Sequence, residues 1–303
     1  MLVANRRSTQ TRGAMNGIEI ISQRYGKRRV RVLRVVRGAD STHTVHEVEV
    51  AALLDGDFSG AYLSGDNGQI VPTDTIKNTI QVLAQKHLGA EIEEFALTLS
   101  DHFLSRYTQV SRVYVEISSR PWTRYTRADG TPHPHVFLGG AKPTPFSCVE
   151  MTRTGVQVVS GVRDLLILKS TASAFKGYPK CEYTTLPETD DRILSTQVEG
   201  SWTFLGRDVN FAKANAAIVS AMLETFAETF SPSVQNTLYL MAGAALQAAP
   251  EVTDIYLALP NKHYLSVDFT PFSQENHKEI FLPTDEPHGQ IEARVSRSAP
   301  KRE

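Results

Sequence analysis

An internal repeat is the feature that most constrains the fold of this chain of 303 residues. Residues 109–117 (QVSRVYVEI) align with residues 251–259 (EVTDIYLAL), 142 positions later, and each segment follows a stretch with helical periodicity. Apolar and polar residues alternate within both segments, which is typical of strands that bury one face. The repeat therefore predicts an α+β fold with two tandem halves, each an antiparallel sheet covered by helices.

Other periodic segments complete this pattern. Alternating runs at 18–24, 28–37 and 43–54 predict an antiparallel hairpin with one wet face. Apolar spacing predicts helices over 73–87, 92–106, 208–229 and 233–248, and strands over 110–118, 154–170, 195–206, 252–259 and 263–269. Residues 119–149 are rich in Pro, Gly and His and are expected to form a long excursion. We divide the chain into a flexible basic tail (1–15), a first domain (16–150) and a second domain (151–303).

The N-terminal charge raises the possibility of a nucleic-acid partner. The first forty residues hold ten Arg and Lys against Glu19 and Asp40, although the net charge of the whole chain is −1. However, Lys27, Arg29 and Arg31 alternate with valines, as expected for the solvated face of a strand. We therefore expect no nucleic-acid partner.

Several other classes of protein are disfavoured. No apolar run approaches the roughly 18 to 20 residues needed to cross a bilayer, and the N-terminus lacks the apolar core of a signal peptide. Cys148 and Cys181 are too few for a disulfide framework or a cysteine metal site, and His133-x-His135 lacks a third ligand. The C-terminal KRE is not a peroxisomal address. We expect a cytoplasmic protein with no membrane partner and no metal.

Residues 175–194 carry the most distinctive chemistry. A Phe-x-Gly turn fixes the direction of the Phe175 ring, residues 183–185 are β-prone, and Arg192 follows a Thr/Glu-rich segment that we interpret as a helix start. A ring beside a guanidinium suits a flat, anionic, heteroaromatic ligand. The alternative is a loop with a buried Phe and a surface Arg.

Two predicted helix starts offer unpaired main-chain N–H groups. Thr73 or Asp74 is placed to cap the first helix, and Ser231-Pro232-Ser233 places Val234 and Gln235 in the first turn of another. Such N–H groups favour an anionic ligand, and the amide of Gln235 can both donate and accept. Ordinary helix starts would have the same sequences.

Four blocks resemble the urate oxidase (uricase) family. They are LKSTxSxFxG at 168–177, continued by YTTLxETxDRIL at 183–194; YGK at 25–27; TDxIKNT at 73–79; and LPNKHY at 259–264. The resemblance spans roughly residues 20–295. It implies two tandem tunnelling-fold (T-fold) domains, whose sheets close into a β-barrel tunnel in a homotetramer with active sites at subunit interfaces.

The resemblance also implies a reaction and a site. Urate, O₂ and water give 5-hydroxyisourate and hydrogen peroxide, without metal or organic cofactor. Carried over by residue, the substrate-binding positions are Thr73, Asp74, Phe175, Leu186, Arg192, Val234, Gln235 and Asn261, and the catalytic proton relay is Lys27, Thr73 and His263. Lys27 and Thr73 would come from a neighbouring subunit.

Alternatives remain at two of these blocks. On spacing alone Lys27 is compatible with a surface lysine, and residues 261–263 with a polar hairpin turn between the flanking strands. A non-catalytic purine-binding oligomer or a pterin-type T-fold oligomer would keep Phe175 and Arg192 without needing Lys27 and Thr73.

Overall fold

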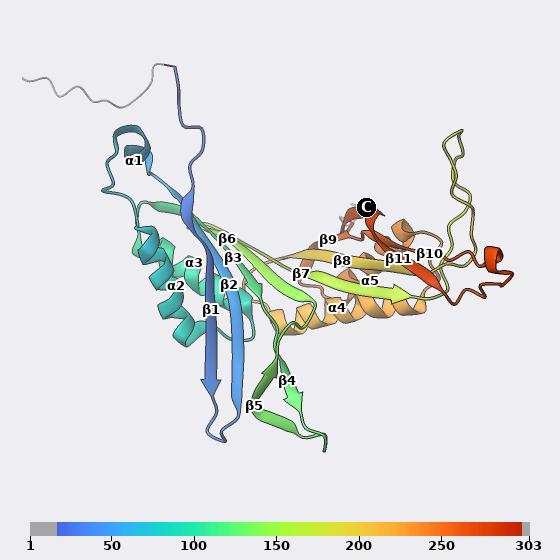
Figure 1. The fold of residues 1–303 in the computed structure, drawn as a ribbon. Coiled ribbons are helices and arrows are strands. Elements are labelled where there is room, and N and C mark those ends of the chain that lie inside the picture. Colours follow the sequence, from blue (N-terminus) through green and yellow to red (C-terminus); the bar gives the residue numbers. More distant parts are fainter. Residues whose placement is uncertain (1–16, 299–303) are drawn as a thin grey trace, which may run out of the picture.

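The computed structural model describes residues 17–298 (Figure 1). The predicted basic tail, residues 1–15, lies outside the described residues. Five α-helices accompany the sheets of the described part. They are α1 (Ser59–Ser64), α2 (Thr73–His87), α3 (Ile92–Arg106), α4 (Phe211–Glu228) and α5 (Val234–Ala248), and a short 3₁₀ helix covers Thr270–Phe272.

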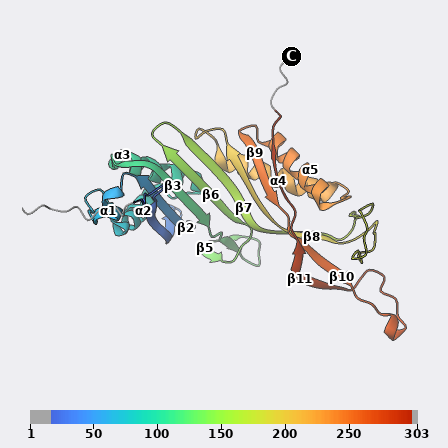
Figure 2. The same cartoon turned by 90° about the horizontal axis from the view of Figure 1, so that it is seen from above.

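A ten-stranded antiparallel sheet runs through the molecule (Figure 2). Its strands follow the order β1-β2-β3-β6-β7-β8-β10-β11, with β9 pairing to β8 and β12. The bounds are β1 (Tyr25–Arg37), β2 (His43–Gly56), β3 (Val110–Ser119), β6 (Thr144–Thr152), β7 (Val156–Lys169), β8 (Leu194–Phe204), β9 (Val252–Ala258), β10 (Asn261–Ser266), β11 (Phe281–Gly289) and β12 (Glu292–Ser296). The prediction of an antiparallel sheet covered by helices is confirmed.

One face of the sheet carries the core. In β3, Val113, Val115 and Ile117 are fully buried, whereas Tyr114 and Glu116 between them are only half-buried. This period of two places the valines against helix α3 and the polar side chains on the opposite, open face. The same alternation in β8 buries Val198 and Trp202, so one continuous core lies between the sheet and both helix pairs.

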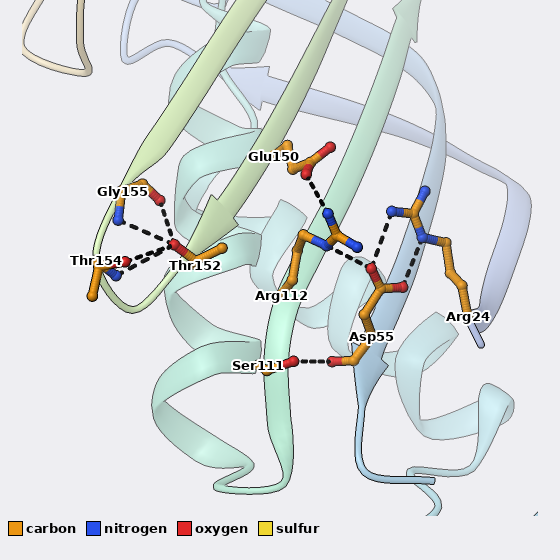
Figure 3. Close-up of polar contacts among 8 residues, drawn as sticks. All are labelled: Arg24, Asp55, Ser111, Arg112, Glu150, Thr152, Thr154 and Gly155. Atoms are coloured by element: carbon orange, nitrogen blue, oxygen red, sulfur yellow. Dashed lines mark hydrogen bonds and ion pairs between the residues drawn. The ribbon is translucent and has the colours of Figure 1, made fainter. Parts of the chain in front are cut away.

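The open face of the first half carries a network of ion pairs (Figure 3). The carboxylate of Asp55 on β2 accepts hydrogen bonds from Nε of Arg24 (2.7 Å) and from Nε of Arg112 on β3 (2.6 Å). Arg112 also donates to Glu150 on β6 at 3.0 Å. The network therefore ties three neighbouring strands to the segment that precedes β1.

The predicted strand at 18–24 is wrong. Pairing between β1 and β2 begins at Tyr25 opposite Leu54, and no strand forms before it. β2 ends two residues later, at Gly56, where the side chain of Gln23 donates to the Gly56 carbonyl. The Gln23 side chain thus occupies a carbonyl that a longer ladder could have used.

The excursion at 119–149 is shorter than predicted. Strands β4 (Thr123–Thr126) and β5 (Pro132–Leu138) form a separate hairpin, and β6 then joins the main sheet between β3 and β7. The position between residues 150 and 151, our predicted domain boundary, therefore falls inside β6.

The interpretation of residues 261–263 as a hairpin turn is wrong. β9 and β10 do not pair with each other; both run along β8, with Ala258 opposite Glu199 and Asn261 opposite Thr196. The predicted strand 263–269 is therefore β10, which begins earlier and pairs on its other side with β11. Because β11 contains two prolines and is mostly exposed, its sequence lacks the alternation that would have predicted it.

Candidate active site

A short connector joins three of the predicted site segments. The Ser173 carbonyl accepts from the main-chain N–H of Arg192 at 2.8 Å, and Phe175 exchanges two main-chain hydrogen bonds with Thr189. On its other side the connector binds the segment before α5, because Ala174 donates to the carbonyl of Ser231 at 2.8 Å. These bonds bring Phe175, Arg192 and the start of α5 to one place.

Arg192 has no carboxylate counter-ion among the described residues. Its guanidinium carbon lies 5.5 Å from the centroid of the Phe175 ring, which stacks on Tyr178 at 4.9 Å. The Nε atom is buried without a hydrogen-bond partner, and no carboxylate within the described residues pairs with the side chain. Burial lowers the pKa of Arg192. A partly buried guanidinium in this state can bind an anion beside the ring.

The start of α5 adds hydrogen-bond donors. The Ser233 side chain caps the helix by accepting from Asn236 N–H at 3.2 Å. Val234 is buried and Gln235 is exposed, and both lie in the first turn, where main-chain N–H groups have no partner within the helix. The predicted placement of these two residues is confirmed.

Asn261 pairs with the first residues of β8, close in sequence to Arg192. It starts β10 opposite Thr196 of β8, and β8 begins two residues after Arg192. Only 8% of Asn261 is exposed, yet its carboxamide forms no hydrogen bond within the described residues. His263 follows two positions later and is half-buried. Both polar ends of the Asn261 amide are thus available to a ligand.

The loop between Phe175 and Arg192 differs from our interpretation. Residues 176–190 form neither a helix start nor a strand and project from the end of the sheet (Figure 1). Leu186 lies in this loop and is 58% exposed, while its carbonyl accepts from the Tyr178 hydroxyl at 2.6 Å. The Thr and Glu side chains of the loop are used in local contacts, such as Glu188 with the main-chain N–H of Gly177. Local polar bonding replaces a helix here.

Lys27, Thr73 and Asp74 form a second group. The hydroxyl of Tyr25 accepts from Val71 N–H at 2.7 Å, which ties the start of β1 to the start of α2. Lys77 chiefly, and Lys27 to a smaller extent, lower the pKa of Asp74. Lys27 lies on β1, which packs against α2.

Two local features position this second group. Gly26 is required because a Cβ there would lie 2.0 Å from the Ala52 carbonyl oxygen. Directly after Lys27, a β-bulge shifts the register between β1 and β2. The predicted cap is wrong: Pro72 is the N-cap, and no side chain caps α2. The carboxylate of Asp74 instead contacts Lys77 and Asn78.

The two groups lie apart in one chain. β1 and α2 are at one end of the elongated molecule, and β10 and the 176–190 loop are at the other, in both Figure 1 and Figure 2. The structure therefore brings together Phe175, Arg192, Val234, Gln235 and Asn261, but not these with Lys27, Thr73 and Asp74. The roles assigned to the individual residues stay predictions.

Sequence reasoning missed two buried hydroxyls at the Arg192 end. Ser173 and Thr196 are fully buried, and within residues 17–298 neither side-chain oxygen has a hydrogen-bond partner. Ser173 is within the block that resembles the urate oxidases, which is the one signal that could have indicated it. A lone Thr inside a strand carries no such signal.

The chain is similar to known uricases along most of its length. The family model described as Uricase matches residues 23–150 and 158–292. The chain belongs to the uricase family. A uricase of Dictyostelium discoideum is 39% identical over 280 residues, which cover 92% of this chain and 98% of the relative. A uricase of Oryctolagus cuniculus is 38% identical over 292 residues, covering 94% and 97%.

Solved uricase structures share the fold. The crystal structure of uricase from Arthrobacter globiformis superposes with a TM-score of 0.88 at 35% identity and covers 95% of this chain and 98% of its own.

Within residues 17–298, no group of three or more His, Cys, Asp or Glu side chains is arranged to hold a metal ion. No helix in that range is long and apolar enough to span a membrane.

Proposed function

We propose that this chain oxidises urate with O₂ and water to 5-hydroxyisourate and hydrogen peroxide, at a site whose anion-binding residue is Arg192. Membership of the uricase family supports urate oxidase activity, and so an oxidoreductase. The observation that carries the site is the partly buried, unpaired Arg192 guanidinium beside the Phe175 ring. A flat anion fits there because the ring offers a face and the guanidinium offers parallel N–H donors.

The other residues of this end complete the recognition of a purine. The free main-chain N–H groups at Val234 and Gln235, and the Gln235 amide, would bond to the donor and acceptor groups on the purine edge. Leu186 would contribute an apolar contact. Asn261, nearly buried and unbonded, would hold O₂ or water over the ligand.

The proton chemistry requires residues from the other end of the molecule. Deprotonating urate to a dianion makes it electron-rich enough to react with O₂, and Arg192 and the helix-start N–H groups would stabilise that charge. Lys27 would accept a proton, the Thr73 hydroxyl would pass it on, and His263 would exchange it with water. Asp74 would add a main-chain N–H contact. In this proposal the side chains and the substrate suffice, so no cofactor takes part.

A second copy of the chain supplies the missing group. β1 and α2, which carry Lys27 and Thr73, lie at the opposite end of the molecule from β10 and the 176–190 loop, which Arg192 closely follows in sequence (Figure 1), so a complete site forms where one chain meets another. We propose a homotetramer in which tandem T-fold halves close their sheets into a barrel tunnel. The long antiparallel sheet of residues 17–298, whose core face packs against the helix pairs α2–α3 and α4–α5 while its other face is open, supports this arrangement.

The direct test mixes purified protein with urate in air. We expect the near-ultraviolet absorbance of urate to fall while hydrogen peroxide forms. A folded oligomer that binds a urate analogue but leaves urate unchanged would instead support the non-catalytic purine-binding alternative.

A further inference from the structure

A cavity lies at the junction of the two halves, away from both groups of site residues. Its volume is about 300 Å³, and residues of α3, α4, β7 and β8 line it together with the segment around β6. The lining is mostly apolar and includes Pro143, Pro145, Phe146, Val162, Trp202 and Val219. A cavity of this size can hold one small organic molecule.

One buried carboxylate belongs to the lining. Glu93 of α3 is only 2% exposed, and its Oε1 atom accepts from the Ser160 hydroxyl and from Nδ2 of Asn215 at 2.8 Å. Asn215 is itself fixed, because its Oδ1 accepts from Trp202 Nε1 at 2.8 Å. Neutral donors from two elements, β7 and α4, thus hold the carboxyl group in one orientation.

The second oxygen of Glu93 is free. Within the described residues Oε2 accepts no hydrogen bond, and no Lys, Arg or His forms an ion pair with Glu93. Ser147 of β6 is fully buried opposite Ser160, and its hydroxyl oxygen has no hydrogen-bond partner in the described part of the chain. A buried carboxylate without a cation is costly, since neutral donors replace only part of its hydration.

We propose that this cavity is a binding site for a small organic cation, an ammonium group carried on an apolar body. The ammonium would bond to Glu93 Oε2, and the apolar body would pack against Trp202, Phe146 and the two prolines. A neutral apolar molecule would fill the same walls but leave the carboxylate unpaired. An anion would be repelled by Glu93.

Calorimetric titration of the assembled protein with benzylammonium tests the proposal, with benzyl alcohol as the neutral probe of similar shape. We expect saturable binding of benzylammonium that is weakened about tenfold or more in Glu93→Gln, since a charge-assisted bond is lost. Benzyl alcohol should bind wild type and Glu93→Gln alike. The matched control is Glu94→Gln, which removes the same charge from the exposed neighbour and should change neither titration.

A second variant keeps the test informative if Glu93→Gln fails to fold. Ala216 lies on an exposed turn of α4 and lines the cavity, so Ala216→Phe should block it without touching the core. Both probes should then fail to bind. The proposal is overturned if benzylammonium shows no saturable binding to wild type, binds equally well to Glu93→Gln, or still binds to Ala216→Phe.

Discussion

Strands β3 and β9 occupy equivalent places in the two halves, each following a helix pair. The aligned residues Tyr114 and Tyr256 both lie on the open face with an arginine over the ring, Arg24 at 5.4 Å and Arg294 at 5.7 Å. Buried apolar side chains alternate with them in both strands. The two halves therefore share the strand pattern and also a tyrosine with an arginine over its ring.

The two strands carry opposite charges at one aligned position. Arg112 of β3 pairs with Asp55 of the neighbouring strand, whereas the aligned residue of β9 is Asp254, which pairs with Arg294. The helix starts diverge as well: α2 begins with exposed Thr73 and Asp74, and α5 with buried Val234. One scaffold thus carries different side chains at matching places, as the proposed site, with different residues from the two ends, requires.

The largest expected effect is on turnover, through Lys27 of β1 and Thr73 of α2. In Lys27→Met we expect turnover to fall roughly 100-fold or more, the usual contribution of a positioned acid–base group, with little change in the affinity of a urate analogue. Thr73→Ala should behave alike, and the double variant should be no worse than the worse single one. Steady-state kinetics with analogue inhibition measures this, with Lys86→Met on the exposed side of α2 as control. Normal turnover with only weaker binding would make Lys27 an electrostatic anchor.

The next largest expected effect is on the affinity for a urate analogue, through Arg192. We expect Arg192→Lys to weaken binding of a urate analogue roughly tenfold or more, since an ammonium cannot give two parallel hydrogen bonds to a flat anionic edge. Analogue titration measures the affinity. Arg207→Lys, an exposed arginine of the same half that pairs with Asp101, is the control. An Arg192→Lys affinity within about twofold of wild type would refute the assignment.

A smaller effect should separate the two open-face ion pairs. Asp55 is 8% exposed and bonds to two arginines, so Asp55→Asn should lower the free energy of unfolding by about 1 to 3 kcal/mol. Asp254→Asn, whose partner Arg294 is mostly exposed, should cost less than about 1 kcal/mol. Urea denaturation at neutral pH measures both, and equal costs would contradict the distinction.

The Asp55 contribution should depend on pH. Burial alone would raise the pKa of Asp55, but the hydrogen bonds from Arg24 and Arg112 outweigh it and leave the pKa lowered. A carboxyl group with a lowered pKa stabilises the fold above its unfolded pKa of about 4 and loses that contribution as the pH falls further. The stability difference between wild type and Asp55→Asn should therefore shrink below about pH 4. A constant difference would exclude the titration of Asp55 as its cause.

The smallest expected effect is that of metal removal. Among the described residues, only the first half has the hairpin β4–β5, whose His133 and His135 rings lie with centroids 4.7 Å apart and are the two neighbouring histidines that a metal ion could bind. Because the proposed reaction needs no metal, exhaustive chelation should leave the rate of urate loss unchanged. Loss of activity with rescue by one metal ion would overturn this prediction.

The sequence predicted what depends on local patterning. Alternation indicated β3 and β9, and the Ser-Pro-Ser segment indicated the start of α5, because strand period and capping are local properties. It could not predict the partners of a strand: β10 lies along β8 because of long-range pairing, which a polar Asn-Lys-His run does not encode. The missing counter-ion of Arg192 likewise depends on which carboxylates the fold brings near.

The central claim is that one site takes residues from two chains, and hybrid oligomers test it most directly. Lys27→Met and Arg192→Ala chains should each be nearly inactive alone, and mixed assemblies should regain activity, at about one site in four if chains pair at random. Native mass spectrometry verifies the hybrids, and urate consumption gives the rate. Verified hybrids without any recovered activity would contradict a site shared between Lys27 of one chain and Arg192 of another.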